Sequence, residues 1–189
     1  MQFETKLLKT IVKELVLEEL SRGKLRVFDF DDTLVHTDAK VHMSNAGGKV
    51  TMSPAQYAVY ERRPGDVFDY SEFQQLINPR EIKWTLKIFK RVYAKYGPSG
   101  VKILTARHSP EPARQFLDTL GMPGVEVIAL GNSDPQEKAN WIAEQIKSAG
   151  LSYVEFFDDS TKNVAAVENL KSQFPDVKIV SRHVVNRKS

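Results

Sequence analysis

The 189-residue sequence contains no cysteine, and this absence excludes several kinds of chemistry. Without a thiol, the chain has no cysteine nucleophile, no cysteine-ligated zinc or iron–sulfur cluster and no disulfide bond. It also has no run approaching the roughly 20 apolar residues that a membrane-spanning helix needs. The first residues lack a secretory pattern, because Lys9, Lys13 and Glu14 interrupt their apolar positions. We therefore expect a cytoplasmic protein with no membrane partner.

Neither positive nor negative residues are in large excess. The 27 Lys and Arg residues exceed the 24 Asp and Glu residues by only three, which favours anionic partners weakly. The hydrophobic fraction of 41% is ordinary for a globular protein, so disorder throughout the chain is excluded. At roughly 150 residues per domain, this length predicts a single domain. Nothing in the composition determines the oligomeric state.

Five short apolar runs alternate with helical patterns along most of the chain. Within each run, apolar and polar residues do not alternate strictly. This pattern is typical of parallel strands covered on both faces. The runs comprise residues 25–30, 101–104, 125–130, 153–157 and 177–180. Helices are expected over residues 82–96, 110–120, 134–149 and 160–174. This order predicts an α/β fold with a Rossmann-like, doubly wound parallel sheet in three α/β/α layers.

Two segments lie outside this alternation. Residues 1–23 carry apolar side chains at helical spacing, and a helix packed on the domain is favoured over a partner-binding helix. Residues 35–79 form an insertion directly after the first strand. It should contain a β-hairpin with strands over 40–43 and 49–52, then short helices over 53–60 and 70–77. Residues 25–34 and 80–189 would make the core.

Acidic residues follow two of the predicted strands at the edge where a doubly wound sheet binds its ligands. Asp29 and Asp31 follow the first strand, and Asp158 and Asp159 follow the fourth. Their mutual repulsion would be severe unless a cation neutralised it. Oxygen ligands without His or Cys suit Mg²⁺. The sequence therefore predicts a Mg²⁺ site at this edge.

A hydroxyl and an ammonium are expected beside these acids. Thr105 ends the second strand, and Lys138 lies in the first turns of the helix after the third. Together with Mg²⁺ they suit an oxyanion such as phosphate. A carboxylate can attack phosphorus to give an acyl phosphate, while a second acid protonates the leaving oxygen and later deprotonates water. A lone Asp-Asp pair is usually a loop or helix cap, but three polar clusters at strand ends favour an active site.

These clusters resemble the motifs of the haloacid dehalogenase superfamily. Residues 27–34, Val-Phe-Asp-Phe-Asp-Asp-Thr-Leu, look like its first motif, DxDx(T/V). Residues 103–107, Ile-Leu-Thr-Ala-Arg, are similar to the second, a hydrophobic strand ending in Thr or Ser. Lys138 fits the third motif, and residues 156–160, with their acidic pair, fit the fourth. The resemblance spans about residues 25–163, and the N-terminal segment departs from it.

The resemblance implies a Mg²⁺-dependent phosphatase that acts through a phosphoaspartate on Asp29. Asp31 would be the general acid/base, and its backbone carbonyl would also contact Mg²⁺. Asp29 and Asp158 would be metal ligands, with Asp159 beside them or acting through water. Because dehalogenating members lack an acid at the position of Asp31, its presence argues for phosphoryl transfer.

The resemblance also implies how phosphate is held. Thr105 and the Ala106 amide would bind it, Arg107 could reach the substrate, and Lys138 would steady the phosphoaspartate. Lys162, just after the acidic pair, competes with Lys138 for this role. Asn163 would either orient the acidic pair or cap its own helix turn.

The substrate stays open at this stage. Residues 35–79 would form a flap or small cap over a phosphorylated small molecule, a nucleotide or a nucleic-acid 3′-phosphate. Aromatic residues of this insertion would either stack on a base or merely pack the cap. One alternative is a catalytically silent member of the superfamily used for binding. A phosphoacceptor signalling domain is less favoured, because the third strand ends in Leu130, Gly131 and Asn132 without an acid.

Overall fold

The computed structural model describes residues 6, 9–13, 15–16, 23–58 and 60–185. At its centre lies a five-stranded parallel sheet with the order β10-β9-β1-β7-β8. The strands are β1 (Lys24–Phe28), β7 (Lys102–Thr105), β8 (Glu126–Ala129), β9 (Tyr153–Asp158) and β10 (Lys178–His183). All five predicted strands are confirmed, because each coincides with one of the apolar runs.

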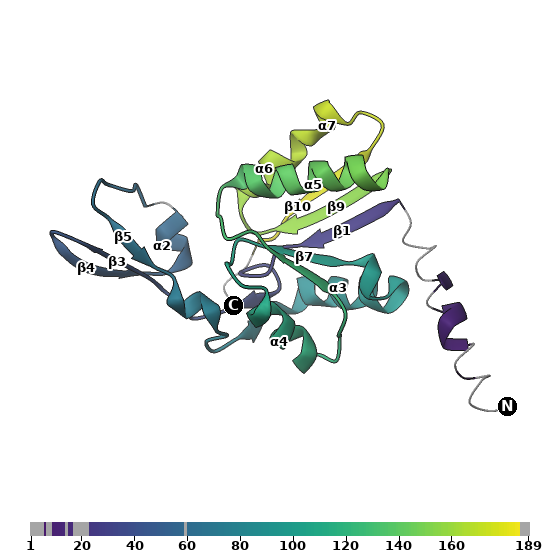
Figure 1. Ribbon diagram of the computed structural model, residues 1–189, viewed down its shortest axis with the longest axis horizontal. Helices are drawn as coiled ribbons and strands as arrows, with labels where there is room; N and C mark the ends of the chain where they lie inside the picture. The colour runs from purple at the N-terminus through teal and green to yellow at the C-terminus, as the bar shows by residue number, and fades with distance from the viewer. Residues whose placement is uncertain (1–5, 7–8, 14, 17–22, 59, 186–189) are drawn as a thin grey trace.

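Helices cover both faces of this sheet (Figure 1). They are α3 (Lys83–Tyr96) and α4 (Glu111–Thr119) on one face, and α5 (Pro135–Ala149), α6 (Thr161–Glu168) and α7 (Leu170–Gln173) on the other. Each face of the sheet has its own hydrophobic core, and β1 contributes side chains to both. Phe28 packs with α3 and α4, whereas Val27 packs with α5 to α7. The fold is therefore mixed α/β with the layered, Rossmann-like arrangement that the sequence predicts.

The expected boundaries of α5 are confirmed by its capping contacts. The Asp134 side chain accepts a hydrogen bond from the Gln136 amide at 2.9 Å, and Pro135 occupies the first turn. Gly150 ends the helix in the left-handed conformation, with φ of +58°. The single helix expected over residues 160–174 is instead divided into α6 and α7 at Asn169.

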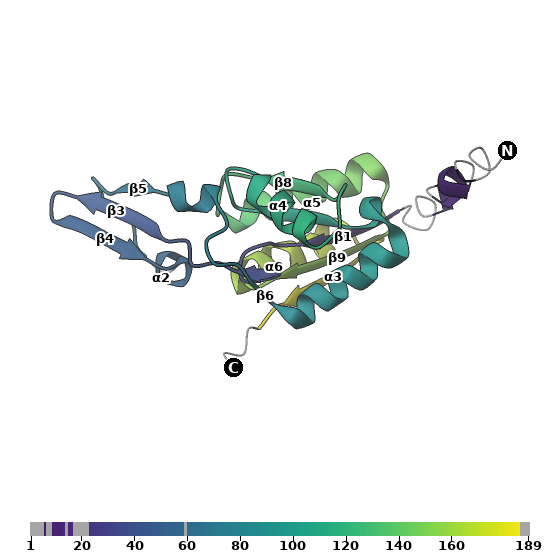
Figure 2. The same cartoon turned by 90° about the horizontal axis from the view of Figure 1, so that it is seen from below.

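The insertion, residues 35–79, projects from the sheet domain as a separate lobe (Figure 2). Its predicted hairpin is confirmed: β3 (Val41–Asn45) pairs antiparallel with β4 (Gly48–Met52). A third strand, β5 (Val67–Asp69), pairs with the other edge of β3 and was not predicted. Three residues are too few to show a period in the sequence. At the junction with the sheet domain, β2 (Val35–His36) pairs with β6 (Arg80–Glu81).

The two helices expected in the insertion are shorter than predicted. The first is α2 (Pro54–Ala58). The second is only a 3₁₀ turn, η1 (Ser71–Gln74), so the prediction of a helix over residues 70–77 is wrong beyond this turn. Gln75 has extended backbone angles, which end the turn.

The described N-terminal residues, 6, 9–13 and 15–16, are helical as expected. The apolar side chains of Ile11, Val12, Leu15 and Val16 are exposed, so the expected packing on the domain is wrong for them. The other apolar positions of this stripe, Leu7 and Leu8, lie outside the described residues. Within the described part of the chain, no helix has both the length and the apolar character to span a bilayer.

Candidate active site

Acids from the ends of β1 and β9 meet at the point where the winding of the sheet reverses. Connections from β1 run towards β7 and β8, whereas β9 and β10 lie on its other side. Asp29 follows β1, and its amide donates to the Phe157 carbonyl of β9 at 2.9 Å. One carboxylate oxygen from each of Asp29, Asp158 and Asp159 lies within 4.8 Å of the others. The structure thus brings together three of the four acids singled out in the sequence.

Lys138 lies between the two most buried of these acids. Its ammonium donates to Asp29 Oδ1 and to Asp158 Oδ2, each at 2.7 Å. The side chain reaches the acids from the first turns of α5 and is only 3% exposed. Lys162, the competing lysine, is exposed to solvent. The geometry therefore favours Lys138 as the lysine of this site.

Asp158 is completely buried, and neighbouring groups fix its orientation. The Asn163 side-chain amide approaches both carboxylate oxygens at 3.0 Å, and the Ser160 amide donates to Oδ1 at 2.8 Å. Of the two roles left open for Asn163, its side chain orients Asp158, while its backbone amide donates to Ser160 Oγ.

The protonation of the cluster follows from its burial and its excess negative charge. Burial raises the pKa of Asp29 well above its ordinary value, and Asp158 and Asp159 raise it further, whereas Lys138 opposes them. Burial, Asp158 and Asp32 raise the pKa of Asp159 to about 7. Burial alone would lower the pKa of Lys138, but Asp29 and Asp158 raise it above its ordinary value. One ammonium cannot neutralise three clustered carboxylates, two of them buried, so the cluster favours a further positive charge.

The donor chemistry of the cluster fits Mg²⁺. The three residues offer carboxylate oxygens alone, the ligands that a small, hard divalent cation prefers. Asp29, Asp158 and Asp159 would hold the ion. The side chain of Asp31 does not belong to this group, so its expected contact through the backbone carbonyl stays a prediction.

Asp31 is held instead by Arg107. The guanidinium makes a bidentate pair with the carboxylate, from Nη2 to Oδ1 at 2.7 Å and from Nε to Oδ2 at 2.8 Å. Its remaining nitrogen, Nη1, donates to the backbone carbonyls of Phe73 and Gln75 in the insertion. Arg107 is 4% exposed. Its expected contact with substrate stays a prediction, because in the structure these partners occupy its guanidinium.

Sequence reasoning missed this pair because 76 positions separate its members. The one signal available was that both residues follow adjacent strands, β1 and β7, at the same edge of the sheet. Neighbouring parallel strands bring their carboxyl ends together, which makes such a pair possible. It does not determine which residues form the pair.

The other expected residues lie at the same edge. Thr105, at the end of β7, is buried, and its hydroxyl accepts a hydrogen bond from the Arg107 amide at 3.2 Å. Ala106 follows it and is partly exposed. Thr33 joins the turn after β1 to β9, because its hydroxyl accepts from the Asp159 amide at 3.0 Å.

The fold and the site together define an α/β protein with a buried acid–lysine cluster at the switch point of its sheet. No protein-family model matches the sequence, and no curated protein matches it significantly. What the site does is therefore argued from its own geometry and chemistry.

Proposed function

We propose that the protein is a Mg²⁺-dependent phosphomonoester hydrolase of the haloacid dehalogenase type, with Asp29 as its nucleophile. The observation that carries this proposal is the placement of Lys138 between Asp29 and Asp158, within a cluster of carboxylate ligands. A solvated lysine would serve solubility alone, whereas this one is buried where a phosphorylated aspartate would need a cation.

The first half-reaction would transfer the phosphoryl group to the protein. Because Lys138 donates to Asp29 Oδ1, Oδ2 is the oxygen assigned to attack phosphorus. The bond between phosphorus and the leaving oxygen breaks as the acyl phosphate forms, and Asp31 gives its proton to that oxygen. Thr105 and the Ala106 amide would hold the transferring group.

The second half-reaction would return Asp29 to its carboxylate form. Asp31, now deprotonated, takes a proton from water, which attacks phosphorus and releases inorganic phosphate. Lys138 stabilises the carboxylate that leaves. Mg²⁺ bound by the cluster would neutralise its carboxylates and polarise a phosphoryl oxygen.

Arg107 would act as a positioning residue for Asp31. The bidentate pair fixes the plane of the carboxylate, and each oxygen retains a second lone pair for another partner. A proton carried on one of these second lone pairs can therefore be donated while Arg107 keeps the carboxyl group in place. Because Arg107 also holds carbonyls of the insertion, the position of the insertion and the orientation of Asp31 are linked.

The decisive test is phosphate release from acetyl phosphate in the presence of Mg²⁺, combined with acid-quench trapping of the phosphoenzyme. We expect Asp29→Asn to abolish both turnover and trapping. The matched control is Asp176→Asn, which changes an exposed carboxylate outside the site and should leave both unchanged. Substantial turnover by Asp29→Asn would falsify the nucleophile assignment.

The same experiment separates the alternatives. A phosphoenzyme that accumulates without releasing phosphate would indicate a phosphoacceptor domain. Failure of the wild-type protein to form a phosphoenzyme, together with measurable binding of inorganic phosphate, would indicate a silent binding protein.

A further inference from the structure

A cavity of about 300 Å³ lies where the insertion meets the sheet domain. Its aromatic lining comes from the insertion, through Phe68, Tyr70 and Phe73. The sheet domain contributes His108 and Ser109, from the loop that follows β7. The insertion and the sheet domain therefore both line this cavity. The catalytic steps proposed above do not use it.

The rings of this cavity are packed together but not sealed. Phe68 and Tyr70 lie nearly parallel, with ring centroids 6.1 Å apart and 19° between their planes. The Tyr70 ring also lies 6.1 Å from that of His108, across the junction. Phe68, Tyr70 and Phe73 nevertheless remain partly exposed. The packing expected of these aromatics is thus observed, and it leaves all three residues partly exposed where they line the cavity.

The cavity is close enough to the acid cluster to share one substrate with it. His108 follows Thr105 by three residues, so the two Cα atoms are at most about 11 Å apart. The Phe73 carbonyl accepts from the same guanidinium that holds Asp31. A phosphate beside Thr105 and a group in the cavity would therefore belong to a molecule the length of a nucleotide.

The size and the lining of the cavity suit a ligand with a single planar heterocycle. Its volume is at the lower end of the roughly 300–1,000 Å³ of small-molecule sites, enough for one ring system. Asp69, Gln74 and Ser109 also line the cavity, and they offer hydrogen-bonding groups that the polar edge of a heterocycle can contact. Stacking on aromatic rings tolerates any base, because every base has a π-face.

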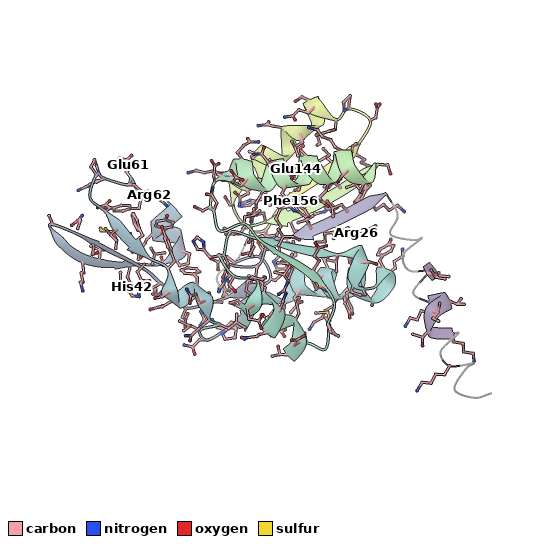
Figure 3. The ribbon with its side chains drawn as sticks, viewed as in Figure 1. Arg26, His42, Glu61, Arg62, Glu144 and Phe156 are labelled. Atoms are coloured by element: carbon pink, nitrogen blue, oxygen red, sulfur yellow. The ribbon has the colours of Figure 1, made fainter. Side chains whose placement is uncertain are left out.

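A positive charge lies next to these rings on the insertion. The Arg62 guanidinium is 5.1 Å from the centroid of Phe68 and 5.5 Å from that of Tyr57, and Figure 3 shows it beside α2 and β5. Its hydrogen bonds to the Tyr57 and Tyr70 hydroxyls connect it to the lining. Arg62 is not among the residues that line the cavity, so its contacts support the positions of Phe68 and Tyr70 from outside it.

We propose that the cavity bounded by Phe68, Tyr70, Phe73 and His108 binds a nucleobase, and that the substrate is a nucleotide whose phosphate is delivered to Asp29. This inference rests on the proposed phosphatase function. The base is recognised by stacking and edge contacts, whether it belongs to a free nucleotide or to the end of an oligonucleotide.

The test compares phosphate release from five substrates: acetyl phosphate, ribose 5-phosphate, adenosine 5′-monophosphate, adenosine 3′-monophosphate and a 3′-phosphorylated oligonucleotide. We expect kcat/KM for at least one adenosine substrate to exceed that for ribose 5-phosphate at least tenfold, through a lower KM. The two mononucleotides and the oligonucleotide distinguish a free from a terminal nucleotide.

Tyr70→Leu should reduce the ratio of kcat/KM for the preferred adenosine substrate to that for acetyl phosphate about tenfold, since base stacking on one ring is worth about 1–3 kcal/mol. Tyr70→Phe keeps the ring and should keep most of this ratio. His108→Ala tests the cavity from the sheet domain, in case Tyr70→Leu disrupts the insertion. Trp84→Leu, which changes an exposed aromatic on α3 outside the lining, is the control.

The outcomes separate this inference from the function on which it rests. Equal kcat/KM for ribose 5-phosphate and the adenosine substrates overturns the nucleobase cavity and leaves the phosphatase intact. If the wild-type protein releases phosphate from none of the substrates, the proposed function fails. The cavity is then judged by adenosine binding alone: NMR shifts confined to residues 68–74 and 108–109 support it, and their absence overturns it.

Discussion

The carboxyl edge of the parallel sheet and the insertion beside it are stabilised by different kinds of contact. At the sheet edge, Asp29, Lys138 and Asp158 are buried, and the ammonium of Lys138 is paired with both carboxylates. In the insertion, partly exposed polar contacts join the strands, such as the Asn45–Asp66 and His42–Glu72 hydrogen bonds. Burial makes the first region rigid and costly to alter, while the second tolerates change.

This difference matches the division of labour that the proposed function requires. Chemistry needs groups held to a fraction of an ångström, which a packed sheet provides, whereas recognition needs a surface that can vary. Arg107 connects the two regions, because it holds Asp31 on one side and carbonyls of the insertion on the other. Four substitutions test this comparison.

The largest effect is expected from Lys138→Met. Removing the ammonium leaves Asp29 and Asp158 buried without their cation, and breaking a buried pair typically costs about 3–5 kcal/mol. Urea unfolding with a chelator present measures this loss, and turnover should disappear with it. Lys162→Met is the matched control and should change the free energy of unfolding by less than about 0.5 kcal/mol. Equal effects of the two variants would refute the assignment of Lys138.

Arg107→Lys should uncouple the two regions. Lysine keeps the charge but cannot form the bidentate pair or reach the insertion carbonyls at the same time. We expect kcat to fall about 10- to 100-fold, which corresponds to about 1.4–2.7 kcal/mol. Amide hydrogen exchange in residues 71–75 should also become faster. Arg114→Lys, an exposed change on α4, provides the comparison, and an unchanged kcat in Arg107→Lys would mean that the contact does not position Asp31.

Asp159→Asn should change how the stability of the sheet edge depends on pH. The pKa of Asp159 is raised to about 7 in the folded protein, above its unfolded value. Its contribution to stability is therefore present below the unfolded pKa and is lost as the pH rises through 7. Two pH units separate pH 5 from this pKa, so with a chelator present the variant should gain about 2–3 kcal/mol relative to wild type between pH 5 and pH 8. A constant difference across this range would show that Asp159 ionises normally.

The smallest effect is expected within the insertion. Asn45→Ala removes the hydrogen bond to Asp66, at 2.8 Å, which links the end of β3 to the segment before β5. Local opening of the insertion should become easier by about 1 kcal/mol, while exchange in β1 and β9 stays unchanged. Equal loss of protection in both regions would mean that they unfold as one unit.

Local patterns in the sequence predicted the strands of the sheet domain and most of its helices, but not the division between α6 and α7 at Asn169. The five apolar runs became the five strands, and the capping signals at Asp134 and Gly150 fixed the limits of α5. These features depend on neighbours within a few residues, so the sequence alone carries them. The hairpin of the insertion was predicted for the same reason, whereas β5 was not, because its three residues are too few to show a period.

For the site, the sequence by itself determined which acids stand at the strand ends. Only the tertiary structure decided which of them share a cluster, that Lys138 rather than Lys162 joins it, and that Arg107 holds Asp31. The order of the strands places their carboxyl ends side by side. The direction of each side chain depends on burial and on partners far away in the sequence. Pairing across such separations is a property of packing, and no local pattern records it.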